Sequence, residues 1–595
     1  MHMFLNGTAM SGQPDHHYLG GAPLLGEVRT APRYRFYVVR DEFPGLVPVR
    51  EGGAGIEGEL YDIDDEVWRT SLGPSEPGEL VLGEIELSDG RTVHAMVLDP
   101  DPLPAADLTD ITEVGSWRRH LAAAGLEAPR GQHLVSLLVR GARVVTAADD
   151  YTADVYAEGE TVTLIGRDLD VAADTVLDGT GCYLLPGGVD PHVHLDFPFG
   201  DTTTSDNVRT GTEAAALGGT TTVINFTQQP TGTSLPATLD AAQTRVAGQA
   251  AIDYGYHVIV TGLDDQTLPD LRLLTEAGVS SVKLFMAYPG TVMVDDATIF
   301  QVLERTGELG ALTCVHAENG GVIDVLTRRA LAAGHTGPAW HGETRPELAE
   351  AEATHRAIRL AEMADAPVYL VHLSCEPALD EVTRARDRGL AVHAETCPHY
   401  LLLDRARYDH GGGFDVAKYV LTPPLRDARN HTHLWRGLRT DDISVVSTDH
   451  CPFCLQGQKT LGADDFTKIP NGGPGIEHRL ELLHDSGVRS GELTLRRLVE
   501  VFSAAPARLF GLYPRKGTVA VGSDADLVLF DPAGQHTISA TTHHMNVDYS
   551  LYEGRKVTGV VRTVVSRGQV VADARRYVGH PGHGRFLVRG PSGRG

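Results

Sequence analysis

Short apolar runs alternate with longer amphipathic stretches through the middle of the chain, from about residue 186 to residue 505. The runs have the length and the β-branched content of buried strands. They are GTTTVINF (219–226), YGYHVIVTG (254–262), SVKLFMAY (281–288), ALTCVHAEN (311–319), PVYLVHLS (367–374), GLAVHAETC (389–397) and ISVVSTDH (443–450). Between them lie stretches such as ELAEAEATHRAIRLAEMA (347–364), whose alternating charges predict a solvated helix face. Seven or eight such repeats predict an α/β fold, a (β/α)8 barrel over residues 186–505.

The segments on both sides of this region share a different pattern. Residues 136–185 contain SLLVRGARVVT, and residues 506–595 contain ADLVLFDP and VTGVVRTVVSRGQVVAD. β-branched runs separated by turns with glycine predict strands. We therefore expect a β-sandwich built from both flanks, with its first part at 136–185 and its second part, followed by a C-terminal tail, at 506–595.

Residues 1–130 predict a separate small domain. Strand-like runs at 35–39, 58–63, 81–87 and 92–98 are divided by Gly, Pro and acidic turns, and a helical segment at 116–125 follows. The pattern is typical of a β-rich α+β domain. The stretch GLEAPRGQ (125–132) has the composition of a linker.

Composition narrows the possible functions. The 595 residues carry a formal net charge of −28, which argues against a nucleic-acid partner. No apolar run reaches the roughly 18 residues that span a bilayer, and the N-terminus does not resemble a signal peptide. Six cysteines are too few for a disulfide framework, and the spacing of Cys451 and Cys454 is interpreted as chance. We expect a cytoplasmic protein without a membrane partner.

Side chains that can bind metal ions lie at or near the ends of the apolar runs. They are His192, His194, Lys283, His316, His372 and Asp449. Because the C-terminal ends of barrel strands surround one pocket, these residues should converge. His192 and His194 are two positions apart in an extended segment, so their side chains point to the same side. Imidazole and oxygen ligands suit Zn²⁺, with Mn²⁺ or Fe²⁺ as alternatives, and six ligands suit two ions about 3.5–4 Å apart.

A single histidine in an apolar strand is usually a core residue, and the chain has 27 histidines. The ordered combination of His-x-His, Lys, His, His and Asp on separate strands favours a metal centre instead. Lys283 is costly to bury as an ammonium ion, which also cannot bind a metal. Its neutral amine can react with CO2 to form a carbamate, whose two oxygens can bridge two ions.

From about residue 136 to 589 the chain resembles the cyclic amidohydrolases of the dihydropyrimidinase/hydantoinase type. The matching motifs are GGVDPHVHLDFPFG, SVKLFMAYPG, CVHAENG, VHLSC, ETCPHYLLLD, LTPPLR, STDHCPF and DFTKIPNGGPGIEHR. The resemblance implies a barrel with a β-sandwich, a binuclear metal centre, and hydrolytic opening of a small cyclic amide to an N-carbamoyl amino acid. It also implies a homo-oligomer, either a dimer or a tetramer.

The resemblance further implies which residue does what. The more buried ion would be held by His192, His194, Lys283 and Asp449, and the other ion by Lys283, His316 and His372, with carbamylated Lys283 as the bridge. Asp449 would carry a proton from the attacking water to the leaving nitrogen. Around the substrate, Tyr288 would stabilise the oxyanion, Thr422 and Asn471 would contact the ring through their backbones, and Phe197, Phe199 and Phe285 would border the pocket mouth.

Two other interpretations stay open. One is another enzyme of the same class, an allantoinase or a dihydroorotase. Dihydroorotase-like enzymes place an arginine two residues after the second histidine, whereas this chain has Asp196 there. Because like charges repel, Asp196 predicts a preference for uncharged rings. The second is a non-catalytic scaffold of the same fold, which should lack metal ligands, yet all six are present.

The N-terminal region has a resemblance of its own. The segments MFLNGTAMSG, APRYRFYVV and GIEGELYDI, with the SWRRHLA ending, resemble the C-terminal domain of allophanate hydrolases, which is related to the γ-glutamylcyclotransferase fold. The resemblance implies a small barrel with one cavity for a small carbamoyl or carboxyl compound. Asn6, Gly7, Thr8 and Glu57 are the candidate residues. A role in assembly or stability is the alternative.

Overall fold

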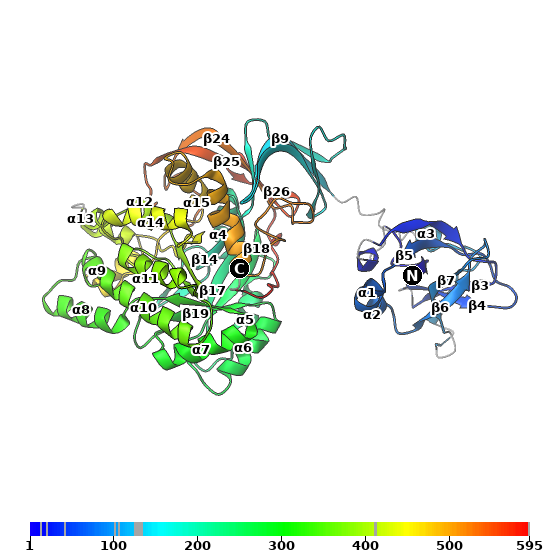
Figure 1. The fold of residues 1–595 in the computed structure, drawn as a ribbon, viewed down its shortest axis with the longest axis horizontal. Helices are drawn as coiled ribbons and strands as arrows, with labels where there is room; N and C mark the ends of the chain where they lie inside the picture. The colour runs from blue at the N-terminus through cyan, green and yellow to red at the C-terminus, as the bar shows by residue number, and fades with distance from the viewer. Residues whose placement is uncertain are drawn as a thin grey trace. The chain divides into compact units, whose positions relative to one another are not determined.

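A computed structural model describes residues 1–11, 15–19, 22–40, 43–99, 103–104, 107–123, 135–409 and 413–592 of the chain. The chain divides into two compact units, Met1–Leu134 and Val135–Gly595. Figure 1 shows the first unit in blue and the second in colours from cyan to red. The linker expected at 125–132 lies outside the described residues. Among the helices of the described ranges, none is long and apolar enough to cross a membrane.

The first unit is built on one mixed β-sheet. Its strands run in the order β2 (Leu24–Arg29), β5 (Glu57–Asp62), β1 (His2–Leu5), β7 (Thr92–Leu98), β4 (Phe43–Pro48), β3 (Tyr34–Val39) and β8 (Leu108–Asp110), with β6 (Leu80–Glu86) paired to β7. Helix α3 (Trp117–Ala123) contributes Trp117 to an apolar core that includes Phe36 and Tyr61. The sequence pattern missed β4 because two prolines and a glycine within it are typical turn residues.

Eight parallel strands form the barrel of the second unit, in the order in which they occur in the chain. They are β14 (Gly188–Val193), β17 (Thr220–Gln228), β18 (Asp253–Ile259), β19 (Ser281–Phe285), β20 (Leu312–His316), β21 (Val368–Leu370), β22 (Val392–Thr396) and β23 (Val445–Val446). An isolated bridge between His450, just after β23, and Val193 of β14 joins the two ends of this sheet. The predicted (β/α)8 barrel is confirmed.

Helices follow the barrel strands and pack around them, as the green and yellow part of Figure 1 shows. They include α4 (Val208–Leu217), α5 (Leu235–Val246), α6 (Thr267–Glu276), α7 (Asp296–Leu309), α10 (Glu347–Met363), α11 (Glu376–Asp387) and α14 (Arg429–Thr440). Helix α10 has the solvated face expected at 347–364 and also a buried face. Glu352 and Arg356 form an outer ion pair, but Glu350 is 2% exposed and points inward. The helix buries one face because that face packs on the barrel.

The two-residue period of the strands decides which side chains enter the barrel. On β20, Leu312, Cys314 and His316 lie on one face of the strand, and Thr313 and Val315 lie on the other. Leu312 and Cys314 belong to an apolar cluster inside the barrel, together with residues of other strands such as Tyr369. His316 follows them on the same inner face, at the C-terminal end of the strand. An apolar floor therefore lies beneath a polar ring of strand ends.

Strands from both flanks of the barrel pair in one nine-stranded sheet. Its order is β11 (Thr161–Gly166), β10 (Asp150–Glu158), β9 (Ser136–Val145), β13 (Tyr183–Pro186), β24 (Leu527–Thr537), β25 (Lys556–Ser566), β26 (Gln569–Asp573) and β27 (Arg576–Tyr577), with β12 (Thr175–Asp178) paired to β9. The flanks meet where β13 runs antiparallel to β24. This pairing ties the segment before the barrel to the segment after it.

We propose that the two units are independent folding domains, because each encloses a hydrophobic core of its own. A truncated protein of residues 135–595 should be soluble. In differential scanning calorimetry its Tm should lie within about 2 °C of that of the same unit in the full chain, since about 1 kcal/mol shifts the Tm of a large domain by only a few degrees. Insolubility, or a fall in Tm of about 10 °C, would show that the first unit stabilises the second.

Candidate active site

A cavity of about 630 Å³ lies at the C-terminal ends of the barrel strands. Its walls contain every residue that the sequence indicated as a metal ligand or a principal substrate contact. These are His192, His194, Lys283, Phe285, Tyr288, His316, His372, Thr422, Asp449 and Asn471, and Phe197 and Phe199 line it as well. Residues up to 279 positions apart in the chain thus share one cavity because the barrel closes.

Asp449 lies between two histidines. Its Oδ1 is 3.1 Å from Nε2 of His192 and 3.3 Å from Nε2 of His194. Burial alone would raise the pKa of Asp449, but the charge of His192 and the hydrogen bonds from both rings hold that pKa well below its usual value. Burial lowers the pKa of His194 to about 4, so its ring is neutral. An ionised carboxylate beside imidazole nitrogens is a ligand set for a cation.

His316 and His372 form a second pair in the same cavity. Nδ1 of His316 lies 2.9 Å from Nε2 of His372. Burial lowers the pKa of both rings, so both are neutral near pH 7. Nδ1 of His372 is buried without a hydrogen-bond partner among the described residues. Two neutral imidazoles at this spacing can bind one cation together.

Lys283 is buried between aromatic rings. Its Nζ lies 4.8 Å from the ring centroid of Phe226 and 5.1 Å from that of Phe285. Burial lowers the pKa of Lys283 to about 8. Near neutral pH, about one lysine in ten is therefore an uncharged amine, against fewer than one in a thousand at its usual pKa. This environment favours a reaction that consumes the neutral amine.

Three of these residues have a left-handed backbone. The φ angles are 66° at Tyr288, 42° at His372 and 46° at Asp449. Side chains other than glycine rarely adopt this conformation, and such strain is concentrated at functional sites. The surrounding fold thus stabilises an unfavourable backbone conformation at these three residues, and their side chains line the cavity.

Glu395 supports the histidines from below, and the sequence analysis did not identify it. Its Oε1 pairs with Nδ1 of His192 and accepts a hydrogen bond from the backbone N of His372, 3.2 Å away. Its Oε2 accepts a hydrogen bond of 2.8 Å from the hydroxyl of Tyr369. A carboxylate that binds Nδ1 fixes the ring and leaves Nε2 for a cation. The signal was present in the sequence, as a His-Ala-Glu triplet at the end of the strand.

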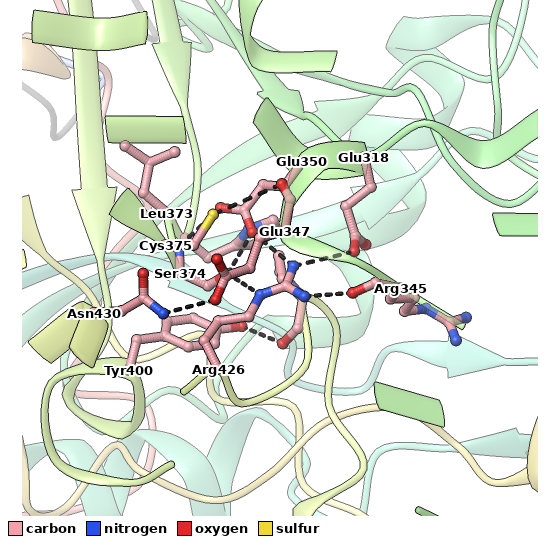
Figure 2. Close-up of polar contacts among 12 residues, drawn as sticks. Glu318, Arg345, Glu347, Glu350, Leu373, Ser374, Cys375, Tyr400, Arg426 and Asn430 are labelled. Carbon is pink, nitrogen blue, oxygen red and sulfur yellow. Dashed lines mark hydrogen bonds and ion pairs between the residues drawn. The ribbon is translucent and has the colours of Figure 1, made fainter. Parts of the chain in front are cut away.

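A second buried acid, Glu318, ends another His-Ala-Glu triplet and belongs to the network drawn in Figure 2. Its Oε2 lies 2.9 Å from Nε2 of His316, and its Oε1 lies 3.9 Å from the guanidinium of Arg426. Arg426 also pairs with Glu350 at 2.8 Å and donates to Oγ of Ser374 at 2.8 Å, two residues after His372. One arginine thus connects the surroundings of both histidines to helix α10.

The substrate side of the cavity is formed by two loops. Nδ2 of Asn471 donates a hydrogen bond of 3.3 Å to the hydroxyl of Tyr288, and Oγ1 of Thr422 lies 3.3 Å from Nε2 of His341. Buried Lys459 donates from Nζ to three carbonyls at 2.9–3.0 Å, those of Val420, Pro470 and Gly472. Because these carbonyls flank Thr422 and Asn471, Lys459 fixes the spacing of the two loops.

Two charged residues differ from the sequence-based expectation. Oδ2 of Asp196 accepts a hydrogen bond of 2.9 Å from the backbone N of Val208, at the start of α4, and the residue is not part of the described cavity wall. Asp196 therefore caps helix α4, and its place in the structure gives no support to a contact with the substrate. Arg345 does line the cavity, with Nη1 3.2 Å from Nδ1 of His341, and the sequence analysis missed it.

Among the described residues of the first unit, Glu59 is a buried carboxylate that the sequence did not indicate as a candidate. The candidate Glu57 is half-buried and pairs with Arg29 and Arg119. Glu59 is buried, accepts a hydrogen bond of 2.8 Å from the hydroxyl of Tyr61 and pairs with Arg118 at 2.7 Å. Residues two positions apart on a strand lie on the same face, so the sequence pattern could not show which of the two glutamates is buried.

Comparisons with known proteins agree with this geometry. Residues 183–571 match the family model of the amidohydrolase family, and residues 1–122 match that of the allophanate hydrolase C-terminal domain. A D-hydantoinase from Streptomyces coelicolor is 52% identical over 76% of this chain and 97% of its own length. A D-hydantoinase from Geobacillus stearothermophilus is 47% identical, with coverage of 77% and 97%. The crystal structure of a dihydropyrimidinase from Brevibacillus agri is 50% identical, covers 77% of this chain and 100% of its own, and has a TM-score of 0.76.

The position of Glu395 leads to a prediction about metal affinity. Glu395→Gln preserves size but removes the charge that orients His192, so the affinity of the cavity for Zn²⁺ should fall by about 10–100-fold. Competition against a chromophoric chelator measures this change. Tyr369→Phe, which removes one hydrogen bond from Glu395, should reduce the affinity less. Equal affinities in the wild type and in Glu395→Gln would rule out an orienting role for Glu395.

Proposed function

The chain belongs to the amidohydrolase family and is a cyclic amide hydrolase, and from this premise we propose that it opens hydantoin and dihydropyrimidine rings to N-carbamoyl amino acids. The observation that carries the proposal is the arrangement of the cavity. The imidazoles of the four predicted histidine ligands, buried Lys283 and the carboxylate of Asp449 share its wall with the hydroxyl of Tyr288. This is the chemistry that hydrolysis of an unactivated amide requires.

We propose that two divalent cations, Zn²⁺ in the first instance, belong in this cavity. His192, His194 and Asp449 would hold one of them, and His316 and His372 the other, with carbamylated Lys283 shared between both. The donor set supports this because His194 and His372 are neutral, Asp449 is ionised and Nδ1 of His372 is buried without a partner among the described residues. Bound cations would polarise the ring carbonyl and make water a stronger nucleophile.

The chain's own side chains supply the proton transfer and the orientation. Asp449 is ionised in the resting cavity and can accept a proton from the attacking water, then return it to the leaving nitrogen. The Tyr288 hydroxyl can donate to the developing oxyanion, and the amide of Asn471 holds that hydroxyl in place. We propose that the backbones of Thr422 and Asn471 contact the substrate ring. Lys459 fixes the distance between the two loops that carry them.

The choice of substrate follows from the wall of the cavity. Phe197, Phe199 and Phe285 make one side apolar, which favours rings with apolar substituents by about 0.8 kcal/mol for each buried CH2 group. Both curated relatives named above are D-hydantoinases, and we propose the D-specificity for this chain too. The runner-up is an allantoinase or a dihydroorotase. Arg345 is the residue that would favour an anionic ring, since it is the cation on the described wall besides Lys283.

A non-catalytic scaffold is the interpretation from another class. It would not need to preserve the ligand geometry, whereas here all six predicted ligands line the cavity and two buried acids orient their rings. We further propose a cytoplasmic homo-oligomer, a dimer or a tetramer, which light scattering on the purified protein would test. The first unit is proposed to bind a small carbamoyl or carboxyl compound, and calorimetric titration of the full chain with N-carbamoyl-β-alanine would test this.

A substrate panel tests the proposed reaction. The full chain should hydrolyse D-5-substituted hydantoins and dihydrouracil with a kcat/KM at least about tenfold above those for allantoin and dihydroorotate, a difference of about 1.4 kcal/mol in transition-state stabilisation. Asp449→Asn serves as the matched inactive variant. Arg345→Gln should change the ranking only if an anionic ring binds there. The highest kcat/KM on dihydroorotate would contradict the proposal.

Lys283 provides a pH-dependent test of the carbamate. Lys283→Ala should lose most bound metal and activity, and short carboxylic acids should restore part of both. Metal-free wild type should regain activity about 25-fold faster at pH 8.5 than at pH 6.5 when dissolved CO2 is held constant, because the neutral fraction of an amine with a pKa of about 8 rises by that factor. Full activity of Lys283→Ala without added acid, or a rate independent of pH, would refute the carbamate.

A further inference from the structure

A second group of metal-binding side chains lies outside the catalytic cavity. It consists of His478, which directly precedes the short helix α15 (Arg479–Leu483), Glu481 within that helix, and His536 on strand β24. Nothing in the proposed ring-opening reaction uses these residues. One ligand atom from each lies within 4.8 Å of the other two, as in the group formed by His192, His194 and Asp449.

Five polar side-chain atoms of this group are buried without a hydrogen-bond partner among the described residues. Both ring nitrogens of His478, both of His536 and Oε2 of Glu481 have no hydrogen-bond partner within the described part of the chain. His478 and Glu481 are each about 1% exposed. Buried polar atoms normally have a partner, and five without one at the same place require an explanation.

The spacing of these atoms suits a shared cation. Nε2 of His536 lies 3.2 Å from Oε2 of Glu481, and Nδ1 of His478 lies 3.8 Å from the same oxygen. Nitrogen and oxygen ligands at the usual distances from Zn²⁺ are separated by about 3.3 Å in a tetrahedral site. The corresponding distances at Asp449 are 3.1 and 3.3 Å. At Glu481, the close atoms approach without forming a hydrogen bond, as expected when both point toward one centre.

The neighbouring charged residues pair with other atoms and leave Oε2 of Glu481 available. Oε1 of Glu481 accepts from the backbone N of Val561 at 3.3 Å and pairs with Arg575 at 3.3 Å, so Oε2 is the oxygen available to a cation. Glu477, the nearest other acid in the sequence, is engaged by Nδ1 of His544 at 3.0 Å. Burial also lowers the pKa of His536, which favours the neutral ring that binds metal.

We propose that His478, Glu481 and His536 bind a divalent metal ion of the Zn²⁺ class, at a structural site separate from the catalytic cavity. Two imidazoles, one carboxylate and no thiolate favour Zn²⁺ over Mg²⁺ or Ca²⁺. Three protein ligands leave one position for water. The ion links α15, which follows the substrate loop carrying Asn471, to strand β24 of the nine-stranded sheet. The proposal does not depend on the ring-opening reaction.

Metal counting on the full-length protein tests this site. Each protein is stripped with a chelator, reloaded with Zn²⁺ and CO2, passed through gel filtration and analysed by mass spectrometry for zinc per chain. The wild type should retain about three ions, two at the catalytic centre and one here. His478→Ala combined with His536→Ala should retain about two and keep the kcat of the wild type. The control His544→Ala, which removes the imidazole that pairs with Glu477 and is not a member of the proposed site, should retain three.

Lys283→Ala separates the two sites, because it should lose the catalytic ions and retain about one. Adding His478→Gln to Lys283→Ala should remove that last ion. Titration of Lys283→Ala with Co²⁺ should produce the visible absorption of a low-symmetry site. The combined variant should not show this absorption. Circular dichroism confirms that each variant is folded. Equal zinc content in the wild type and in the His478 and His536 variants would overturn the proposal. A Lys283→Ala protein with unchanged zinc would instead contradict the catalytic centre.

Discussion

The structure depends on the burial of ionisable groups at the mouth of a closed barrel. Burial disfavours the charged form of every such group, so the pKa values of Lys283, His194, His316 and His372 fall, while neighbouring charges favour the ionised forms of Asp449 and His192. Removing one partner from a buried pair typically costs about 3–5 kcal/mol. The outer acids follow from this constraint. Glu395 and Glu318 hold the rings, and Arg426 pairs with both Glu318 and Glu350, so removing one charge from this network leaves another buried without its partner.

Much of this site could be predicted from the sequence because side chains alternate between the two faces of a strand, and this alternation can be seen in the local sequence. His316 follows Leu312 and Cys314 at every second position, and a closed barrel leaves such residues no direction but inward. The resemblance to a known family then gave roles to Tyr288, Thr422 and Asn471. The outer residues could not be predicted in this way. Arg426 pairs with Glu350 over 76 positions, and Lys459 holds the carbonyl of Val420 over 39, contacts that depend on how helices and loops pack.

The residues that the sequence did not place have the same physical origin. The charges on α10 alternate along the sequence and predict its solvated face, but Glu350 is buried because the opposite face of the helix packs on the barrel. Asp196 lies two residues after His194, where the sequence suggested an effect on the substrate. Its backbone has a positive φ, and its carboxylate accepts a hydrogen bond from the backbone N of Val208. In the first unit Glu57 and Glu59 share a strand face, and burial alone separates them.

The pairing of β13 with β24 has a consequence for synthesis. Strand β13 ends at Pro186 and β24 begins at Leu527, so about 340 residues separate the two partners. At about 5–20 residues per second, the ribosome needs roughly 20–70 s to deliver the second strand after the first. Throughout that interval the edge of β13 is an open template for another strand. The nascent chain therefore presents an unpaired sheet edge for most of its translation, and a delay in the C-terminal third prolongs the period in which chaperones must protect it.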